Sequence, residues 1–256
     1  MDLIVCTGEP ENLVNVRSWL DTAEDDHGSV RIVADGLSPQ QISDAKPQFN
    51  YVADHVDKGG PVASLQHGYE RTRGPILAYI HDDVIIHEKG WDRRVMREFA
   101  DPAVGVVGFG GATGLGAVDI YHTPYRIHQL ARFGYASNVP DWQTHGLRFA
   151  GERDVAVLDG FSIIVRRELL DKAGGWPIKK LVFHNYDFWL CCMARRLGYR
   201  VRQVGVACHH LGGRNSTRPT YNGWLSRKLG KTDSDVHREA HEYVYEEFRD
   251  VLPIRV

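Results

Sequence analysis

The sequence has no long apolar run and no surplus of charge of either sign. No segment approaches the ~18 apolar residues of a membrane-spanning helix, and the N-terminus lacks the basic residues and the apolar length of a signal peptide. The formal net charge of -2 argues against strong non-specific attraction to nucleic acid or to anionic membranes, which needs a basic surplus. We therefore expect a cytoplasmic protein without a membrane span.

Cysteine is scarce, and its spacing does not suggest a disulfide framework. The four cysteines stand at positions 6, 191, 192 and 208, in or beside apolar runs and without a CxxC spacing. Such residues are typically buried small hydrophobes in a reducing compartment. We expect free thiols.

The alternation of apolar and amphipathic segments predicts an α/β fold. The 256 residues, 43% of them hydrophobic, suffice for the core of a single domain. Short apolar runs alternate with amphipathic stretches, which is typical of strands joined by helical crossovers into a mixed, mainly parallel sheet flanked by helices. In the first half we predict strands at 3–6, 30–34, 51–53, 75–80 and 104–108, and helices at 11–20 and 62–71.

The loops after three of these strands carry polar residues. They contain Thr7-Gly8-Glu9, Asp35-Gly36 and His81-Asp82-Asp83. The carboxyl ends of parallel strands form the ligand crevice of such sheets, so these loops should converge.

The adjacent carboxylates of Asp82 and Asp83 are the most informative feature. They end the apolar run 76–80, and Mg²⁺ and Mn²⁺ prefer such hard oxygen ligands. A solvated turn or a helix N-cap is the alternative. The apolar residues 84–86 directly after the pair argue against it, because they indicate that the chain returns to the core there.

Two further segments lack the hydrophobic period of a strand or a helix. The glycine-rich run 110–116 resembles a phosphate-binding loop but lacks the GK[ST] ending of a P-loop, so a mobile loop or a bulge is the preferred interpretation. The segment 119–153 is rich in aromatic, histidine and proline residues. We interpret it as a long loop or an inserted cap, of the kind that often carries acceptor specificity.

The second half again shows strands and helices, with one further carboxylate at a helix start. We predict a strand at 161–165, a helix at 167–173, a helix beginning at Asp187 and ended by Gly198, and a strand at 201–208 followed by His209-His210. Asp187 is either a plain N-cap or a general base. Burial against Phe188 and Trp189 would raise its pKa toward neutral, which favours the second role.

The C-terminal part is predicted to be helical. Residues 214–231 carry five basic side chains, which we interpret as a solvated surface in preference to a diphosphate site. Residues 233–248 have the pattern of an amphipathic helix, which would pack on the core or in a homodimer interface.

The residues from Leu3 to about Gly213 are similar to glycosyltransferases of the GT-A fold, in particular to family 2. The similarity rests on a strand end of the form His-x-Asp-Val, here residues 81–84, and on a Phe-His-x-Tyr-Asp segment, here residues 183–187. It implies a GT-A domain at 1–213, divided into a nucleotide-sugar half at 1–108 and an acceptor half at 109–213. Residues 214–256 would form a C-terminal helical extension.

The resemblance implies roles for individual residues. His81-Asp82-Asp83 stands in place of the DxD motif, with His81 replacing its first aspartate, and Asp187 stands where inverting members keep the catalytic base. Trp189 stands where many relatives have a second aspartate. The implied nucleotide-sugar contacts are Thr7, Gly8, Glu9, Asp35, Gly36, Gly60, Gln66, His81 and Asp82; the acceptor contacts are Asp159, Gly160 and Trp189; and the ligands of Mn²⁺ or Mg²⁺ are Asp83 with His209 or His210.

The implied activity is a metal-dependent, inverting transfer of a sugar from a nucleoside-diphosphate sugar. The acceptor is unidentified and could be a glycan, a lipid, a protein or a modified nucleic-acid base. Two alternatives remain open on the sequence: a nucleotidyltransferase-like enzyme, whose fold can have the same strand and helix count, and a catalytically silent nucleotide-sugar binder.

Overall fold

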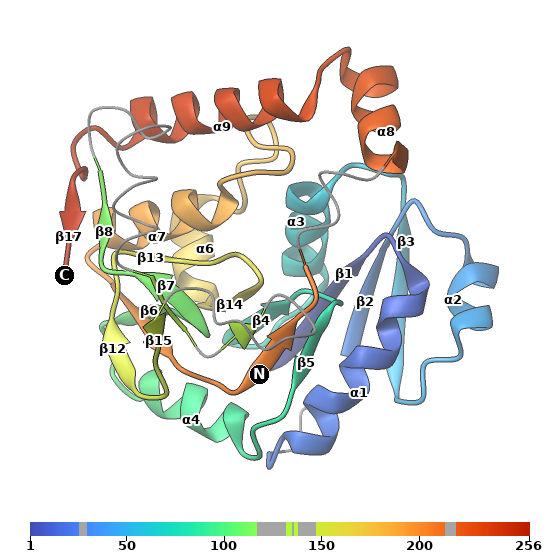
Figure 1. Cartoon of the computed structure of the whole chain (residues 1–256), viewed down its shortest axis with the longest axis horizontal. Coiled ribbons are helices and arrows are strands. Elements are labelled where there is room, and N and C mark those ends of the chain that lie inside the picture. Colours follow the sequence, from blue (N-terminus) through green and yellow to red (C-terminus); the bar gives the residue numbers. More distant parts are fainter. Residues whose placement is uncertain (26–29, 117–131, 135, 138–146, 213–218) are drawn as a thin grey trace.

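An eight-stranded mixed sheet forms the centre of the protein (Figure 1). The computed structural model describes residues 1–25, 30–116, 132–134, 136–137, 147–212 and 219–256. In sheet order the strands are β12 (Glu152–Asp154), β15 (Arg200–Val204), β6 (Val104–Gly108), β14 (Ser162–Arg166), β4 (Ile76–Ile80), β1 (Asp2–Thr7), β2 (Val30–Asp35) and β3 (Tyr51–Val56).

Most of these strands point the same way. β1, β2, β3 and β4 run parallel to one another, and so do β6 and β15. β14 lies antiparallel between β4 and β6, and β12 lies antiparallel on β15 at the sheet edge. The predicted mixed, mainly parallel sheet is confirmed.

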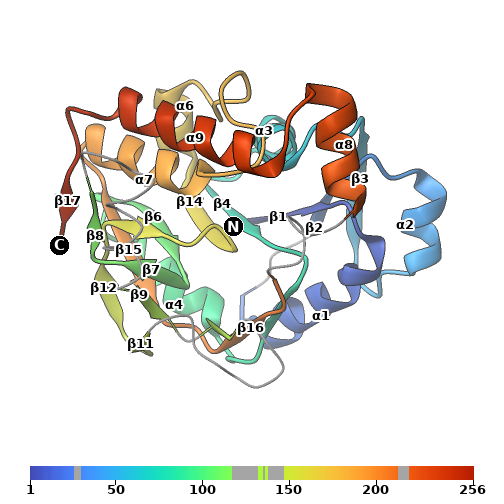
Figure 2. The ribbon, with the colours of Figure 1, turned by 45° about the horizontal axis from the view of Figure 1, so that its top comes forward.

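Helices cover both faces of the sheet, which explains why its central strands β4 and β6 are buried and apolar throughout (Figures 1 and 2). In β4, Ile76, Ala78 and Ile80 pack into one core cluster, whereas Leu77 and Tyr79 pack into the other. One face carries α1 (Leu13–Thr22), preceded by a 3-10 turn at Pro10–Asn12, with α2 (Pro39–Ala45) and α4 (Trp91–Glu98). The other face carries α3 (Pro61–Arg71), α6 (Arg167–Ala173), α7 (Tyr186–Arg196) and α9 (Asp233–Glu247).

Two of these helices are absent from the sequence prediction, α2 and α4. Helix α2 is short and begins with a capping box, in which Ser38 and Gln41 exchange hydrogen bonds between side chains and backbone. Helix α4 is mostly charged and buries Trp91, Asp92 and Val95. Few apolar positions therefore carry the helical period in either segment.

Smaller sheets lie beside the central one. The first contains β10 (Ala136–Ser137), β16 (Cys208–His210) and β5 (Val84–Ile86); the second contains β11 (Leu147–Arg148), β9 (Arg132–Gly134), β7 (Gly110–Ala112) and β13 (Val157–Leu158); the third pairs β17 (Ile254–Arg255) with β8 (Gly114–Leu115). The prediction of a single strand at 201–208 is therefore wrong. The chain leaves the central sheet after Val204 and forms β16, which pairs antiparallel with β5.

The glycine-rich segment 110–116 is neither a mobile loop nor a phosphate-binding loop. It forms the buried strands β7 and β8, and it does not line the pocket described below. A Cβ atom at Gly111 would lie 2.6 Å from the carbonyl oxygen of Val157 on the paired strand β13. Glycine is required there by close backbone approach.

The C-terminal part contains α8 (Pro219–Leu229) and α9. Val236, Ala240 and Val244 of α9 are buried within this chain, so the amphipathic face packs on the core. Arg227 and Lys228 are exposed, in keeping with a solvated basic surface, whereas Arg214 and Arg218 lie outside the described residues. Most of the segment 119–153, expected to be a loop or cap, also lies outside them.

The four cysteines are free, as predicted, and three of them are fully buried. Among the helices of the described residues, none is long and apolar enough to cross a membrane.

We predict that Gly68→Ala destabilises the protein. Helix α3 packs against β1 through this glycine, where an added Cβ would lie 2.6 Å from Ile4 Cγ2. Overpacking of this kind typically lowers the free energy of unfolding by about 1–3 kcal/mol. Urea denaturation followed by circular dichroism measures it.

The matched control is Gly223→Ala in α8. An added Cβ there meets only the flexible end of Arg227, at 3.1 Å. Alanine favours a helix interior over glycine by about 0.5–1 kcal/mol, so this variant should keep or gain stability. Equal losses in both variants would contradict the packing argument.

Candidate active site

A pocket opens at the carboxyl ends of β1, β2 and β4, where the polar loops were expected to converge. Nine of the residues implied by the resemblance line it: Thr7, Gly8, Glu9, Asp35, Gly60, His81, Asp82, Asp83 and Gly160. Gly160 belongs to the other half of the chain. It reaches the pocket because β14 runs antiparallel to β4, which puts the start of β14 beside the end of β4.

Other implied residues lie elsewhere. Gly36 forms a turn with φ +74°, and Asp159 precedes Gly160 without lining the pocket. Gln66 Oε1 accepts a hydrogen bond from the backbone N–H of Trp176 at 2.7 Å, which braces the Gly174-Gly175-Trp176 turn against α3. Trp189 is only 3% exposed and packs against Trp176 in the core. It does not line the pocket.

The pocket is also lined by residues to which the sequence assigned no role in it, among them Lys58, Phe183, Tyr186, Tyr221 and Trp224. Tyr221 and Trp224 stand three residues apart on α8, so they share one face of that helix. The spacing was readable in the sequence. Nothing in it indicated that α8 would lie over the first half of the chain.

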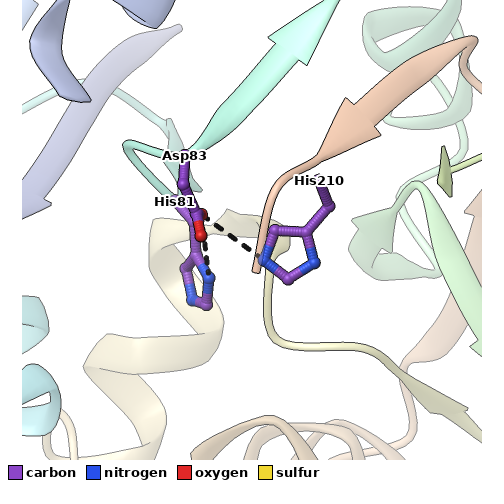
Figure 3. A group of neighbouring side chains, drawn as sticks. All are labelled: His81, Asp83 and His210. Carbon is purple, nitrogen blue, oxygen red and sulfur yellow. Dashed lines mark ion pairs between the residues drawn. The ribbon is translucent and has the colours of Figure 1, made fainter. Parts of the chain in front are cut away.

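Three side chains form a candidate metal site: His81, Asp83 and His210 (Figure 3). Asp83 Oδ1 lies 3.9 Å from His81 Nδ1 and 3.4 Å from His210 Nε2. This Oδ1 is buried and accepts no hydrogen bond from the described residues. Two imidazole nitrogens around an orphaned carboxylate oxygen suit Mn²⁺ and other divalent ions, so the residues fit the predicted metal.

The small sheet explains why His210 rather than His209 joins this cluster. In the β16–β5 pair His210 lies opposite Val84 and His209 opposite Ile85, and consecutive strand residues face opposite sides. The ring of His210 stacks on Phe161, with centroids 4.8 Å apart. His209 instead faces His87, with ring centroids 5.3 Å apart.

Asp82 points away from this cluster and joins two loops. Its Oδ2 accepts a hydrogen bond from Thr7 Oγ1 at 2.5 Å, and its Oδ1 accepts one from Asn12 Nδ2 at 3.3 Å. Burial raises the pKa of Asp82 to about 7, an effect that the Thr7 hydroxyl opposes and the Asp83 charge reinforces. The turn after β4 is therefore buried and bonded to the first loop.

Asp187 stands in the first turn of α7, where Asn185 is the N-cap residue, and it is not among the residues that line the pocket. The carboxylate of Asp187 accepts backbone N–H bonds from Gly160 at 3.0 Å and from Phe188 at 2.9 Å. Burial raises its pKa to about 7, with a smaller contribution from the negative charge of Asp159, while the backbone N–H bonds oppose the shift. A carboxylate tuned in this way can accept a proton near neutral pH.

The sequence model of the glycosyltransferase-like family matches residues 54–243. The chain belongs to this family. A search of curated proteins finds no matching sequence. Membership confirms the predicted resemblance to glycosyltransferases, and with it the prediction of an enzyme of this class.

Solved structures extend the comparison to the fold. The mannosyltransferase PcManGT from Pyrobaculum calidifontis, solved with GDP-Man and Mn²⁺, is 15% identical with a TM-score of 0.55, over 95% of this chain and 68% of that one. TarS of S. aureus is 14% identical with a TM-score of 0.53, over 97% and 70%. GalNAc-T7 with UDP, GalNAc and Mn²⁺ is 10% identical with a TM-score of 0.59, over 95% and 54%. The GT-A fold is thereby confirmed for this member of the glycosyltransferase-like family.

We predict that Asp159→Asn lowers the pKa of Asp187. The variant removes the neighbouring negative charge that disfavours ionisation, so the carboxyl should titrate below its wild-type value of about 7. Carbon-13 NMR of the aspartate carboxyls across a pH series measures the shift. Asp44→Asn, on exposed helix α2, makes the same charge change far from the site, and a shift of equal size there would contradict the assignment.

Proposed function

We propose that this protein is a metal-dependent, inverting glycosyltransferase that uses a nucleoside-diphosphate sugar. The observation that supports it most is the cluster of His81, Asp83 and His210 beside a pocket that is lined by Gly160, whose N–H donates to Asp187. The neighbours solved with GDP-Man or UDP and with Mn²⁺ support the same class of donor.

The pocket offers suitable chemistry for such a donor. Asp35, whose Oδ1 accepts the backbone N–H of Gly59 at 2.8 Å, can bind hydroxyl or N–H groups of the nucleoside. Lys58 places a cation on the pocket wall for the phosphates. Tyr221 and Trp224 add aromatic faces, on which a planar base or a sugar ring can pack.

In the proposed mechanism, His81, Asp83 and His210 would hold the divalent ion. When bound, the ion would supply neutralisation of the charge that develops on the leaving nucleoside diphosphate. Asp187 accepts the proton of the acceptor hydroxyl, whose oxygen forms the new bond to the anomeric carbon while the diphosphate oxygen leaves with the bonding electrons. Gly160 holds the Asp187 carboxylate through its N–H. Attack opposite the leaving group inverts the anomeric centre.

The proposal names the acceptor only by its reactive group and includes a cytoplasmic location. A glycan, a lipid, a protein or a modified base each offers the nucleophilic oxygen or nitrogen that the mechanism requires. The free cysteines support the cytoplasmic location that we propose.

We predict that release of nucleoside diphosphate requires metal and the residues of the cluster. A screen of sugar nucleotides with Mn²⁺ or Mg²⁺ should find a donor from which the wild type releases the diphosphate. Asp83→Ala and His210→Ala should lose that release, because each removes one of three candidate ligands.

His209→Ala is the matched control, since this neighbouring histidine faces His87 and not the cluster. It should retain release. If the wild type and all variants bind the donor without releasing the diphosphate, the result would support a silent binder. Absence of donor binding would exclude the glycosyltransferase. Release of pyrophosphate would indicate a nucleotidyltransferase.

We predict that Asp187→Asn abolishes turnover while donor binding persists. The amide cannot accept a proton, and loss of a general base typically lowers the rate by about 10²–10⁴-fold. In the wild type the rate should rise with pH through about 7, because the base works only after its raised pKa is passed. Nucleotide release against pH, with calorimetric donor binding, tests both statements. Unchanged release in the variant would remove Asp187 from the mechanism.

A further inference from the structure

Tyr186 connects the candidate metal site to the start of helix α7, and the mechanism above gives it no role. Its side chain is 9% exposed. The hydroxyl lies 2.8 Å from His81 Nε2 and donates to the carbonyl oxygen of Gly160 at 3.2 Å. Both contacts are to groups at the end of β4 or the start of β14.

A phenol has only one hydrogen to donate, so the two contacts constrain each other. The Gly160 carbonyl can only accept, which assigns the Tyr186 hydrogen to it. The Tyr186 oxygen then accepts from His81, whose Nε2 must carry the hydrogen. A neutral imidazole protonated at Nε2 has its lone pair on Nδ1.

We propose that Tyr186 is a positioning residue that holds His81 as the Nε2–H tautomer and so leaves Nδ1 free to ligate a divalent cation. This inference rests on the proposed function, because it concerns the same metal site. The nitrogen that it leaves unprotonated is the one that faces Asp83 Oδ1, at 3.9 Å (Figure 3). A ligating histidine is commonly oriented in this way by a hydrogen bond to its second nitrogen.

The surroundings hold the Tyr186 hydroxyl in place. A Cβ atom at position 160 would lie 2.6 Å from the hydroxyl oxygen, so only glycine allows this approach. The Tyr186 ring packs edge-on against Trp176, with centroids 6.2 Å apart. On the other side, the His81 backbone N–H donates to Phe161 at 2.9 Å, which fixes the imidazole relative to β14.

Gly160 also links the metal site to the proposed base. Its carbonyl accepts from Tyr186 and its N–H donates to Asp187, two consecutive residues of α7. Asn185, directly before them, lies 2.7 Å from His241 Nδ1 of α9 through its side-chain amide. The C-terminal helix therefore contacts the segment that orients both functional groups.

Long-range proton–nitrogen NMR of the imidazoles tests the tautomer directly. Spectra of the metal-free protein at about pH 8, where histidine is neutral, should show His81 protonated at Nε2 in the wild type. Tyr186→Phe removes the oxygen that accepts the hydrogen of His81 Nε2. In this variant the Nδ1–H tautomer of His81 should appear beside the Nε2–H tautomer or replace it. A wild-type His81 protonated at Nδ1 would overturn the proposal.

Mn²⁺ affinity, measured by electron paramagnetic resonance without donor or acceptor, tests the consequence. Tyr186→Phe should bind Mn²⁺ about 10- to 100-fold more weakly than the wild type, the usual effect of losing such a partner. Tyr199→Phe is the matched control: this tyrosine is also 9% exposed, and its hydroxyl bonds Lys172. It should bind Mn²⁺ as the wild type does.

The variant Asp83→Ala separates the hypothesis of a metal site from the hypothesis that Tyr186 positions His81. If that variant loses Mn²⁺ while Tyr186→Phe binds as tightly as the wild type, the positioning role is overturned and the metal site stands. If the wild type itself binds no Mn²⁺, the metal-dependent function fails and the positioning role fails with it. Equal weakening in Tyr186→Phe and Tyr199→Phe would also overturn the role, because it would point to a general loss of packing.

Discussion

Five aspartates gathered at one edge of the sheet are the constraint on which the site depends. They are Asp35, Asp82, Asp83, Asp159 and Asp187. Burial raises the pKa of Asp35, Asp82 and Asp187, because a carboxylate removed from water loses hydration. Charges in such surroundings are stable only when they are hydrogen-bonded, protonated or paired with cations.

Most of these carboxylates meet that requirement within the chain. Asp35 and Asp187 accept backbone N–H groups, and Asp82 accepts the hydroxyl of Thr7. Asp83 differs, since its buried Oδ1 faces two imidazoles without a hydrogen bond from the described residues. A cation bound at Asp83 would complete its coordination and also lower the repulsion within the group. Burial contributes to both features: Asp83 Oδ1 is buried without a hydrogen bond from the described residues, and burial together with the charge of Asp159 raises the pKa of Asp187.

The antiparallel strand β14 brings the two halves of the chain together at this site within one domain. Its start lies beside the end of β4, so Gly160 meets the His81 turn, and α7 begins over both. In an entirely parallel sheet the start of that strand would lie at the opposite edge. The proposed nucleotide and acceptor halves are therefore joined through backbone hydrogen bonds at the site itself, including the bond from His81 N–H to Phe161.

The sequence by itself determined the α/β architecture, the convergence of three polar loops, and Asp187 near a helix start. These follow from local rules, namely the apolar periods of strands and helices and the common edge of parallel strand ends. Local rules misjudged the segment 110–116, where glycine serves close strand packing. The acceptor contact that the resemblance implied for Trp189 stays a prediction, since this residue is buried and does not line the pocket.

Only the tertiary structure decided which side chains meet. His210 rather than His209 faces Asp83 because β16 pairs with β5 in one register, and a shift of one residue would exchange the two. Tyr186, Tyr221 and Trp224 reach the pocket because helices α7 and α8 dock over the first half of the chain. Register and docking depend on contacts between residues far apart in sequence, whereas periodicity reports only what neighbouring residues share.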